Sequence, residues 1–258
     1  MKISGDFRAR VLAREWLGGT FLNLGSALTA EMAGCAGFDW LLLDHEHGPG
    51  GDETLLQQLQ AVAATPATAI VRIAENAPVR FKRALDLGAA GVMVPWVSTA
   101  DQARAAVSSL RYPPRGIRGV SVAQRANRFG RVPGYLQNAE RDICVVVQLE
   151  TRAAMGEIEA IAAVDGIDGL FIGPGDLSAD LGHLGNPAHP EVQAAIADGC
   201  RRIRAAGKPA GILAPVEADA RRYFEMGFSY VAIGSDVGLL AASSAAVLSR
   251  MREATGQS

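Results

Sequence analysis

The chain has 258 residues, of which 49% are hydrophobic and 20% are charged, and its formal net charge is -2. This length suits one large α/β domain, such as a barrel of about 250 residues, and we expect residues 1–258 to form a single domain. The nearly balanced charge gives no reason to expect nucleic acid or a membrane surface as a partner. No apolar run approaches the ~20 residues of a membrane span.

The number and spacing of the cysteines fit a protein of a reducing compartment. Cys35, Cys144 and Cys200 are far apart and lie in apolar contexts, which is typical of reduced core residues. The segment from Met1 to Arg8 has no signal-peptide core. These features predict a cytoplasmic protein.

Short runs of β-branched and apolar residues recur along the chain. Runs of this length are typical of strands that are buried on both faces of a parallel sheet. The predicted strands lie near residues 19–24, 39–44, 69–73, 91–95, 143–149, 169–173, 209–213 and 230–234.

Helical patterns separate these strands. Leu55, Leu59 and Val62 have the spacing of one helix face, Gly88 suits a helix C-cap and Ser98 suits an N-cap. The predicted helices lie at residues 26–37, 53–64, 77–87, 99–110, 152–163, 190–206, 217–226 and 236–254.

Strands that alternate with helices predict a parallel sheet, and eight such units favour a closed (β/α)₈ barrel of the TIM type. An open doubly wound sheet is the alternative, but no dinucleotide fingerprint follows the first strand. The stretch from Arg111 to Asp142 is too long for a simple link and is rich in Gly, Pro and Arg. We expect it to cover part of the active-site face.

Two carboxylates follow the ends of successive predicted strands. Glu150 and Asp176 each follow an apolar run, one βα repeat apart. Because the carboxyl ends of parallel strands meet at one rim, the two acids should lie close together. Either acid alone is better interpreted as a solvated loop residue. The pair, beside the Gly173–Gly175 turn and with no thiolate nearby, favours a hard divalent cation.

Other polar residues also lie at predicted strand ends. Asp44 and His47 follow one strand, and a histidine suits proton transfer because it titrates near neutral pH. His45 and His47 could instead chelate a transition metal, whereas a loop histidine bonded to backbone is the simpler interpretation of His45. Arg72 stands inside an apolar strand and must face a carboxylate of the protein or of a substrate. Asp86 lies at a predicted helix end, and its local sequence alone suggests a solvated acid.

Two further features bear on mechanism. The turn from Gly173 to Asp176 could present backbone N–H groups to an anion, or could need glycine only for its geometry. The chain has three lysines, Lys2, Lys82 and Lys208, and none lies at a predicted strand end. An imine mechanism needs a lysine inside the site, so carbonyl chemistry here would have to use a metal.

Five motifs, spread over nearly the whole chain, together resemble one known family. The resemblance is to the HpcH/HpaI family of metal-dependent class II pyruvate-type aldolases, and the set is specific although single pieces are not. The motifs are Asp44–Pro49, Val71–Arg72, Arg111–Gly119, Gln148–Arg152 and Phe171–Ser178.

The resemblance implies roles for the metal ligands and the proton-transfer group. Glu150 and Asp176 would bind a divalent cation, which would be Mg²⁺, Mn²⁺ or Co²⁺. His47 would transfer protons, supported by Asp44 and Asp86.

The resemblance also implies substrate contacts. Arg72 would hold the carbonyl and enolate oxygen of a pyruvate-type substrate, and the backbone of Gly175 and Asp176 would receive its carboxylate. Gln148 would lie near the metal-bound water, and Leu213 would line the aldehyde pocket. His45 stands where a close relative has a small residue, which bears on acceptor preference.

The implied reaction is the reversible cleavage of 4-hydroxy-2-oxo acids to pyruvate, or hydroxypyruvate, and an aldehyde through a metal-stabilised enolate. Relatives of this kind imply a homohexamer, built as two trimers, with an extra N-terminal helix and a C-terminal helix exchanged between subunits. The alternatives are a metal-dependent 2-oxo acid decarboxylase or a citramalyl-CoA-type lyase on the same fold. A non-catalytic binding protein is disfavoured because the acid pair, His47 and Arg72 occur together.

Overall fold

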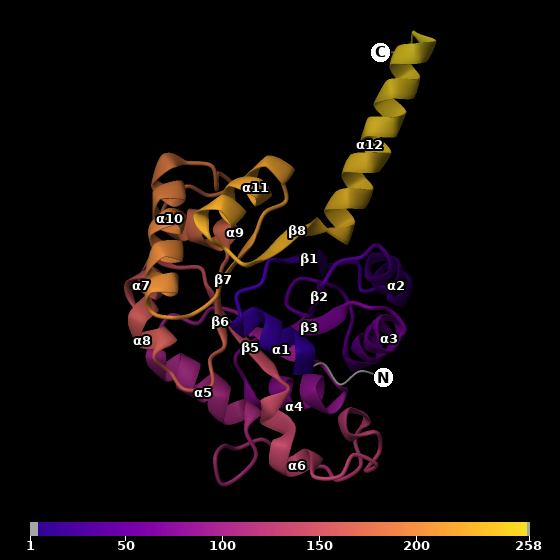
Figure 1. Ribbon diagram of the computed structural model, residues 1–258. Coiled ribbons are helices and arrows are strands. Elements are labelled where there is room, and N and C mark those ends of the chain that lie inside the picture. Colours follow the sequence, from indigo (N-terminus) through magenta and orange to yellow (C-terminus); the bar gives the residue numbers. More distant parts are fainter. Residues whose placement is uncertain (1–4, 257–258) are drawn as a thin grey trace.

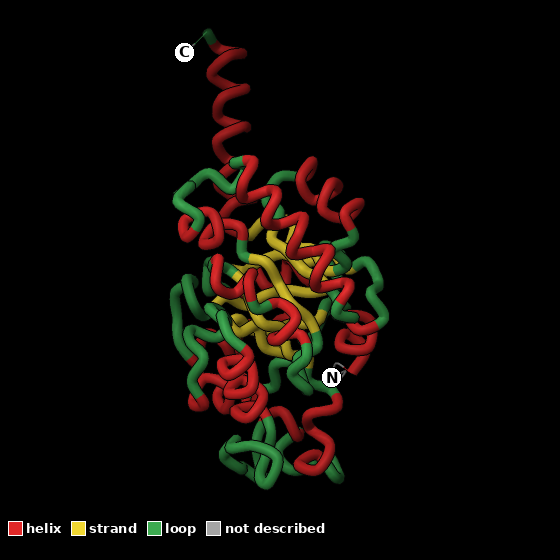
Figure 2. Tube along the Cα trace, turned by 90° about the vertical axis from the view of Figure 1, so that its left-hand side faces the viewer, coloured by secondary structure: helices red, strands yellow, loops and turns green. Residues whose placement is uncertain are grey.

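A computed structural model describes residues 5–256 and shows a closed barrel of eight parallel strands in the order β1 to β8. Figure 2 shows the strands at the centre with helices around them. The predicted (β/α)₈ barrel is confirmed, and each predicted strand is present with its ends within two residues of the predicted positions. The strands are β1 (Leu17–Leu22), β2 (Trp40–Asp44), β3 (Thr68–Arg72), β4 (Gly91–Val94), β5 (Cys144–Leu149), β6 (Gly169–Ile172), β7 (Ala210–Leu213) and β8 (Tyr230–Ser235).

Helices follow the strands and pack around the barrel, and an additional helix precedes β1, as expected. The predicted helix over 152–163 is broken at Glu157 into two, and a short helix after β6 was not predicted. The helices are α1 (Gly5–Leu12), α2 (Ala27–Cys35), α3 (Asp52–Val62), α4 (Pro78–Asp86), α5 (Ala100–Leu110), α6 (Tyr135–Asn138), α7 (Arg152–Gly156), α8 (Ile158–Ala162), α9 (Pro174–Asp180), α10 (Pro190–Ala205), α11 (Glu217–Met226) and α12 (Asp236–Thr255), with short 3₁₀ turns η1 (Arg125–Asn127) and η2 (Ala139–Arg141).

The inside of the barrel is filled by aromatic side chains. The ring of Trp40 lies 6.4 Å from that of Phe171 and 6.3 Å from that of Tyr230, measured between centroids. Gly19 and Gly211 make this packing possible, because a Cβ atom at either position would overlap the ring of Trp40 or Tyr230. A filled interior leaves only the two ends of the barrel for chemistry.

The long segment between α5 and β5 lies at the amino-terminal end of the barrel, so the expectation that it covers the active-site face was wrong. Arg125 Nη1 donates to the carbonyl of Leu87 at 2.6 Å, just after α4 ends. Tyr135 and Asp142 line a cavity of about 430 Å³ together with Thr68, where β3 begins. The physical reason is topological: a link from a helix to the next strand of a (β/α)₈ barrel must cross the end where strands start.

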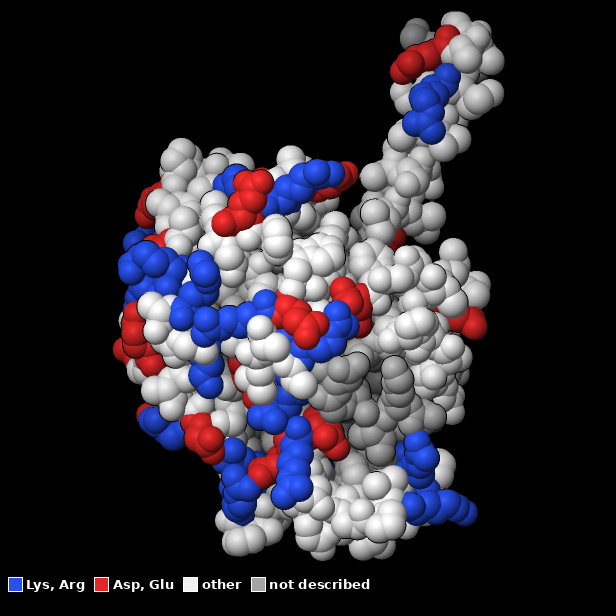
Figure 3. All heavy atoms as spheres, in the orientation of Figure 1, with Lys and Arg blue, Asp and Glu red and all other residues white. Residues whose placement is uncertain are grey.

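The last helix, α12, projects away from the barrel (Figure 1). None of its residues is buried, and it exposes a row of apolar side chains. Figure 3 shows charges of both signs on the barrel, whereas the charged residues of α12 gather at its two ends. In the described part of the chain, we find no helix with the length and apolarity that crossing a membrane requires.

Candidate active site

A buried ion pair joins the carboxyl ends of β2 and β3. Asp44 and Arg72 are the last residues of these strands and are register partners in the sheet. Arg72 Nε donates to Asp44 Oδ1 at 2.9 Å, and Nη2 donates to Oδ2 at 2.6 Å. Only 5% of Arg72 is exposed. The protein itself therefore supplies the carboxylate that a buried arginine needs.

Asp44 also organises the turn that follows β2. Its carboxylate accepts from Asn23 Nδ2 and from the backbone N–H of Glu46 and His47, the last two at 3.1 and 3.3 Å. Burial alone would raise the pKa of Asp44, but the hydrogen bond and charge of Arg72, with the two backbone N–H groups, lower that pKa below its ordinary value. Asp44 thus remains ionised and holds the backbone of His47.

The two histidines of this turn have different surroundings. The side chain of His47 is 63% exposed, and its Nε2 lies 3.9 Å from Glu46 Oε2. His45 Nε2 lies 3.3 Å from Gln58 Oε1, and burial lowers the pKa of His45. Since the rings face different partners, they do not form one chelating pair. His47 is the histidine that a molecule at the barrel mouth can reach.

Glu150 directly follows β5 and is 1% exposed. Its Oε1 accepts from the backbone N–H of Trp96 at 2.7 Å, and its Oε2 accepts from Gln148 Nε2 at 2.6 Å. Trp96 has φ 55°, a left-handed conformation that bulky residues rarely adopt. Burial is the main cause that raises the pKa of Glu150 to about 7, and the carboxylates of Asp176 and Glu46 add to it.

Asp176 lies in the first turn of α9, which starts immediately after β6. Gly173 makes the junction possible, because a Cβ atom there would lie 2.7 Å from Glu150 Oε2 and 2.8 Å from Gln148 Nε2. Pro174 then fits the first helical position. The Gly-Pro-Gly turn therefore lets α9 start near Glu150, and Asp176 lies close enough to Glu150 for the two carboxylates to interact electrostatically.

The chemistry of these side chains fits a hard divalent cation. The carboxylates of Asp176 and Glu46 lie near enough to the buried Glu150 to raise its pKa. The positive charge of Arg72 has the opposite effect on the pKa of Glu150. Within residues 5–256, the Oε1 atom of Gln148 is buried without a hydrogen-bond partner. Buried polar atoms of native proteins almost always have one. A cation with oxygen ligands, or its water, would satisfy these groups.

Two candidates from the sequence have other positions. Leu213 is the last residue of β7 and packs partly buried against the cluster inside the barrel, at the same end as Glu150. Asp86 ends α4, and its Oδ1 accepts from Arg118 Nη2 at 2.7 Å. Because α4 runs back toward the starts of the strands, Asp86 lies at the opposite end of the barrel. Within one chain Asp86 therefore lies away from His47, so the predicted support of His47 by Asp86 would have to come from another subunit.

The lysines are remote from the acids in the part of the chain that the structure describes. Lys208 precedes β7, and its Nζ donates to the carbonyl of Ile167, which precedes β6. Lys82 lies within α4, where its side chain approaches Gly119 of the amino-terminal loop. Lys2 lies outside the described residues.

Sequence reasoning missed three residues that build the site. Glu46 Oε2 lies 3.1 Å from Arg72 Nη1, and burial raises the pKa of Glu46. Asn23 contacts Asp44, and its own backbone N–H donates to Asp236 Oδ1 at 2.7 Å. Asn23 follows the end of β1 and Asp236 follows the end of β8. Extending the search for polar strand ends to the first and last strands would have found both.

Known proteins resemble this chain over nearly its whole length. The family described as HpcH/HpaI aldolase/citrate lyase matches residues 18–243. The 5-keto-4-deoxy-D-glucarate aldolase of Salmonella paratyphi A is 49% identical over 237 residues, covering 92% of this chain and 93% of that protein.

Solved structures agree. An HpcH/HpaI aldolase/citrate lyase family protein from Burkholderia cenocepacia is 40% identical, with a TM-score of 0.93 over 96% of this chain and 99% of that one. An HpcH/HpaI aldolase from Desulfitobacterium hafniense is 27% identical, with a TM-score of 0.88 over 95% and 96% of the two chains. The predicted carbon–carbon lyase of the aldolase class is confirmed. The chain belongs to the HpcH/HpaI aldolase/citrate lyase family.

Proposed function

We propose that this enzyme cleaves 4-hydroxy-2-oxo acids, reversibly, to pyruvate or hydroxypyruvate and an aldehyde, and that it needs a divalent cation. The observation that carries the proposal is the group of carboxylates around Glu150, to which Asp176 and Glu46 contribute at the mouth of a filled barrel. The similarity to a 5-keto-4-deoxy-D-glucarate aldolase supports a sugar-acid substrate of this type.

Glu150 and Asp176 would hold the cation, with Gln148 beside it. Mg²⁺, Mn²⁺ and Co²⁺ all accept oxygen ligands of this kind. When bound, a divalent cation supplies Lewis acidity that stabilises negative charge on the 2-oxo group. The remaining steps belong to the side chains around it.

Arg72 would bind the 2-oxo oxygen of the substrate. Asp44 takes two of the five N–H donors of the guanidinium and fixes its plane, and a third nitrogen, Nη1, faces Glu46. The N–H groups that remain can point toward the barrel mouth. A donor fixed in advance stabilises the enolate without reorganising, which is the most effective form of electrostatic catalysis.

His47 would move the proton. In cleavage, a base takes the proton of the 4-hydroxyl group, the C3–C4 bond breaks, and its electron pair passes into the enolate. The aldehyde leaves, and C3 of the enolate is then protonated. His47 suits this exchange because its ring is exposed while its backbone is held by Asp44.

The first turn of α9 would receive the substrate carboxylate. The N–H groups at the start of a helix lack partners within the helix, and Gly175 and Asp176 occupy such positions. Leu213 would line the pocket for the aldehyde portion, since it ends β7 on the same rim.

We also propose that the active form is a homohexamer of two trimers in which α12 packs on another copy of this chain. The helix has 20 residues with none buried. Its exposed apolar side chains are Val237, Leu239, Leu240, Val247, Leu248 and Met251. Asp86, at the far end of its own barrel, could act on His47 only from such a neighbouring subunit.

The test is a cleavage assay with 5-keto-4-deoxy-D-glucarate and a panel of other 4-hydroxy-2-oxo acids. We expect the release of pyruvate or hydroxypyruvate in the presence of Mg²⁺, Mn²⁺ or Co²⁺. The reverse reaction with both donors and several aldehydes ranks the acceptors. Failure to cleave any member of the panel with any of the three metals would overturn the proposal.

A further inference from the structure

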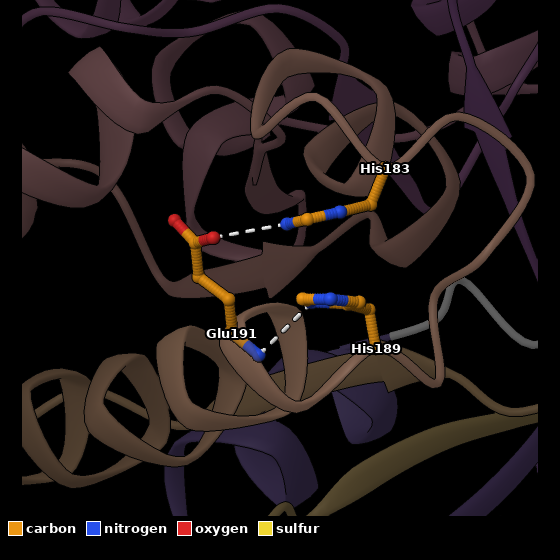
Figure 4. Close-up of side chains that lie close together, drawn as sticks. All are labelled: His183, His189 and Glu191. Carbon is orange, nitrogen blue, oxygen red and sulfur yellow. Dashed lines mark hydrogen bonds and ion pairs between the residues drawn. The ribbon is translucent and has the colours of Figure 1, made fainter.

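A second cluster of metal-binding side chains lies outside the carboxylate site. It consists of His183, in the link between α9 and α10, His189, which caps α10, and Glu191, in the first turn of α10 (Figure 4). Because α10 leads back to the start of β7, its own start lies at the carboxyl-terminal end of the barrel. The cluster is therefore on the rim of the active-site face, outside the ring of strands.

The ligand atoms of the three side chains lie within 4.8 Å of one another. His183 Nε2 lies 2.9 Å from Glu191 Oε2, and His189 Nδ1 accepts from the backbone N–H of Glu191 at 3.2 Å. The two rings are stacked with centroids 3.4 Å apart and planes inclined by 16°. In residues 5–256, His183 Nδ1 and His189 Nε2 have no hydrogen-bond partner.

We infer that His183, His189 and Glu191 form a binding site for a borderline transition-metal ion of the Zn²⁺ type. Neutral imidazole is a preferred ligand of Zn²⁺, and two imidazoles with one carboxylate are a common donor set. The site thus differs in chemistry from the one at Glu150 and Asp176, where the donors are oxygens. The cluster shares no residue with the proposed catalytic machinery, so the inference does not depend on the proposed function.

Binding requires a small rearrangement. A metal lies in the plane of each imidazole that binds it, so the stacked rings must turn apart and point their nitrogens at one centre. Both histidines lie in the link from Leu181 to His189, and both are half-buried, so their rings have room to turn. The ion replaces the hydrogen bond between His183 and Glu191, and it displaces any proton from the ligand nitrogens.

One neighbouring charge opposes the ion. Arg152 Nη2 lies 3.3 Å from Glu191 Oε1, with the two side chains 65% and 48% exposed. An ion pair this exposed is weak and competes little for the carboxylate, but its positive charge repels a cation. Removal of that charge should therefore tighten metal binding, which a purely hydrogen-bonded cluster would not do.

The ion would tie the link that follows α9 to the first turn of α10. Asp176 lies on α9, so the metal would brace the rim that carries a catalytic-site acid without touching the substrate. Zinc binding at this cluster should therefore raise the thermal stability of the protein, since a ligand that binds only the folded state stabilises that state.

The experiment is equilibrium dialysis of the tag-free protein against Zn²⁺, combined with X-ray absorption at the zinc edge. Wild type should bind one equivalent beyond the carboxylate site, with two imidazole ligands in the absorption spectrum. His183→Gln keeps a donor for Glu191, and His189→Asn keeps a helix cap. Each variant should lose that equivalent or bind it about tenfold or more weakly, and Arg152→Gln should bind it more tightly.

The matched control is Glu217→Gln, in the first turn of α11, where Glu217 pairs with exposed Arg221 as Glu191 pairs with Arg152. It should leave zinc binding unchanged, and Glu191→Gln should weaken it. Zinc confined to the carboxylate site, with no imidazole signal in wild type, would overturn the inference. So would wild-type binding in both histidine variants.

Discussion

Two buried acids at opposite ends of the barrel, Asp168 and Glu150, have opposite surroundings. At the amino-terminal end, Asp168 is 2% exposed and is paired with Arg8 Nη2 at 2.8 Å, while its Oδ2 accepts from the backbone N–H of Val145 at 2.9 Å. At the carboxyl-terminal end, Glu150 is equally buried but has neutral donors only, and the carboxylates of Asp176 and Glu46 lie near it. Asp168 has a direct ion pair, whereas Glu150 feels Arg72 only at a distance and has two other carboxylates near it.

This difference separates stability from function. A buried carboxylate is costly unless it is paired, so an uncompensated group of them persists only where a ligand completes it. At the amino-terminal end, Asp168 finds its partner within the chain, on α1. The carboxyl-terminal end is built to receive a cation and an anionic substrate, as is general for barrel enzymes.

The largest effect is expected from removing a metal ligand. Asp176→Ala should lower the rate of retro-aldol cleavage by on the order of a thousandfold, because several kcal/mol of charge stabilisation depend on the cation. Steady-state kinetics of pyruvate release measure this. The control is Asp180→Asn on the same helix, which should remain active. Full activity in Asp176→Ala would exclude Asp176 as a ligand that matters.

The next largest effect separates the two histidines. His47→Ala should lose about a hundredfold or more in turnover, the usual worth of a proton-transfer group, while it still binds metal. His45→Ala should change the preference among acceptor aldehydes more than the rate, since His45 faces Gln58. Kinetics with an aldehyde panel and a metal-binding assay compare the variants. The opposite order of rates would show that the two roles are exchanged.

A smaller effect is expected when the charge at Arg72 is kept but its shape is lost. Arg72→Lys cannot reproduce the planar fork that Asp44 holds with two hydrogen bonds. We expect cleavage and the exchange of pyruvate methyl protons to slow together, by about tenfold to a hundredfold. Proton exchange at the wild-type rate would remove Arg72 from enolisation and leave it a role in acceptor binding alone.

The smallest effect on activity should come from breaking the amino-terminal pair. Asp168→Asn leaves Arg8 without its partner, and we expect a loss of about 1–3 kcal/mol in the free energy of unfolding. The turnover of the folded enzyme should stay near the wild-type value. Denaturant unfolding and kinetics on the same preparation compare the two quantities. A large loss of turnover without loss of stability would contradict the separation of the two ends.

The sequence predicted the fold and the polar residues at the strand ends well because both depend on local patterns. Apolar runs identify the strands, and polar residues that end them, such as Glu150 and Asp176, identify the rim. The partner of Arg72 could not be read in this way, since it depends on the register that pairs Asp44 with Arg72 across two strands. The end of the barrel at which Asp86 lies follows from the direction of α4 and was not considered in the sequence.

Some features need three-dimensional packing. Glu46 lies two residues after Asp44, in a polar segment that the sequence alone suggests is exposed. Only the fold shows that the Glu46 side chain reaches Arg72 and is mostly buried. The cluster of His183, His189 and Glu191 depends on how the link after α9 returns to α10, which no periodicity describes. Likewise, α9 is a helix of seven residues, too short to leave a helical pattern in the sequence.

The most direct test of the central claim is the exchange of pyruvate methyl protons with solvent, followed by NMR, in metal-stripped enzyme before and after a divalent cation is added. We expect no exchange without metal, recovery with Mg²⁺, Mn²⁺ or Co²⁺, and no change of protein mass after borohydride treatment with pyruvate. Exchange that persists in the metal-free protein, with a stable pyruvyl adduct on a lysine such as Lys208, would contradict it.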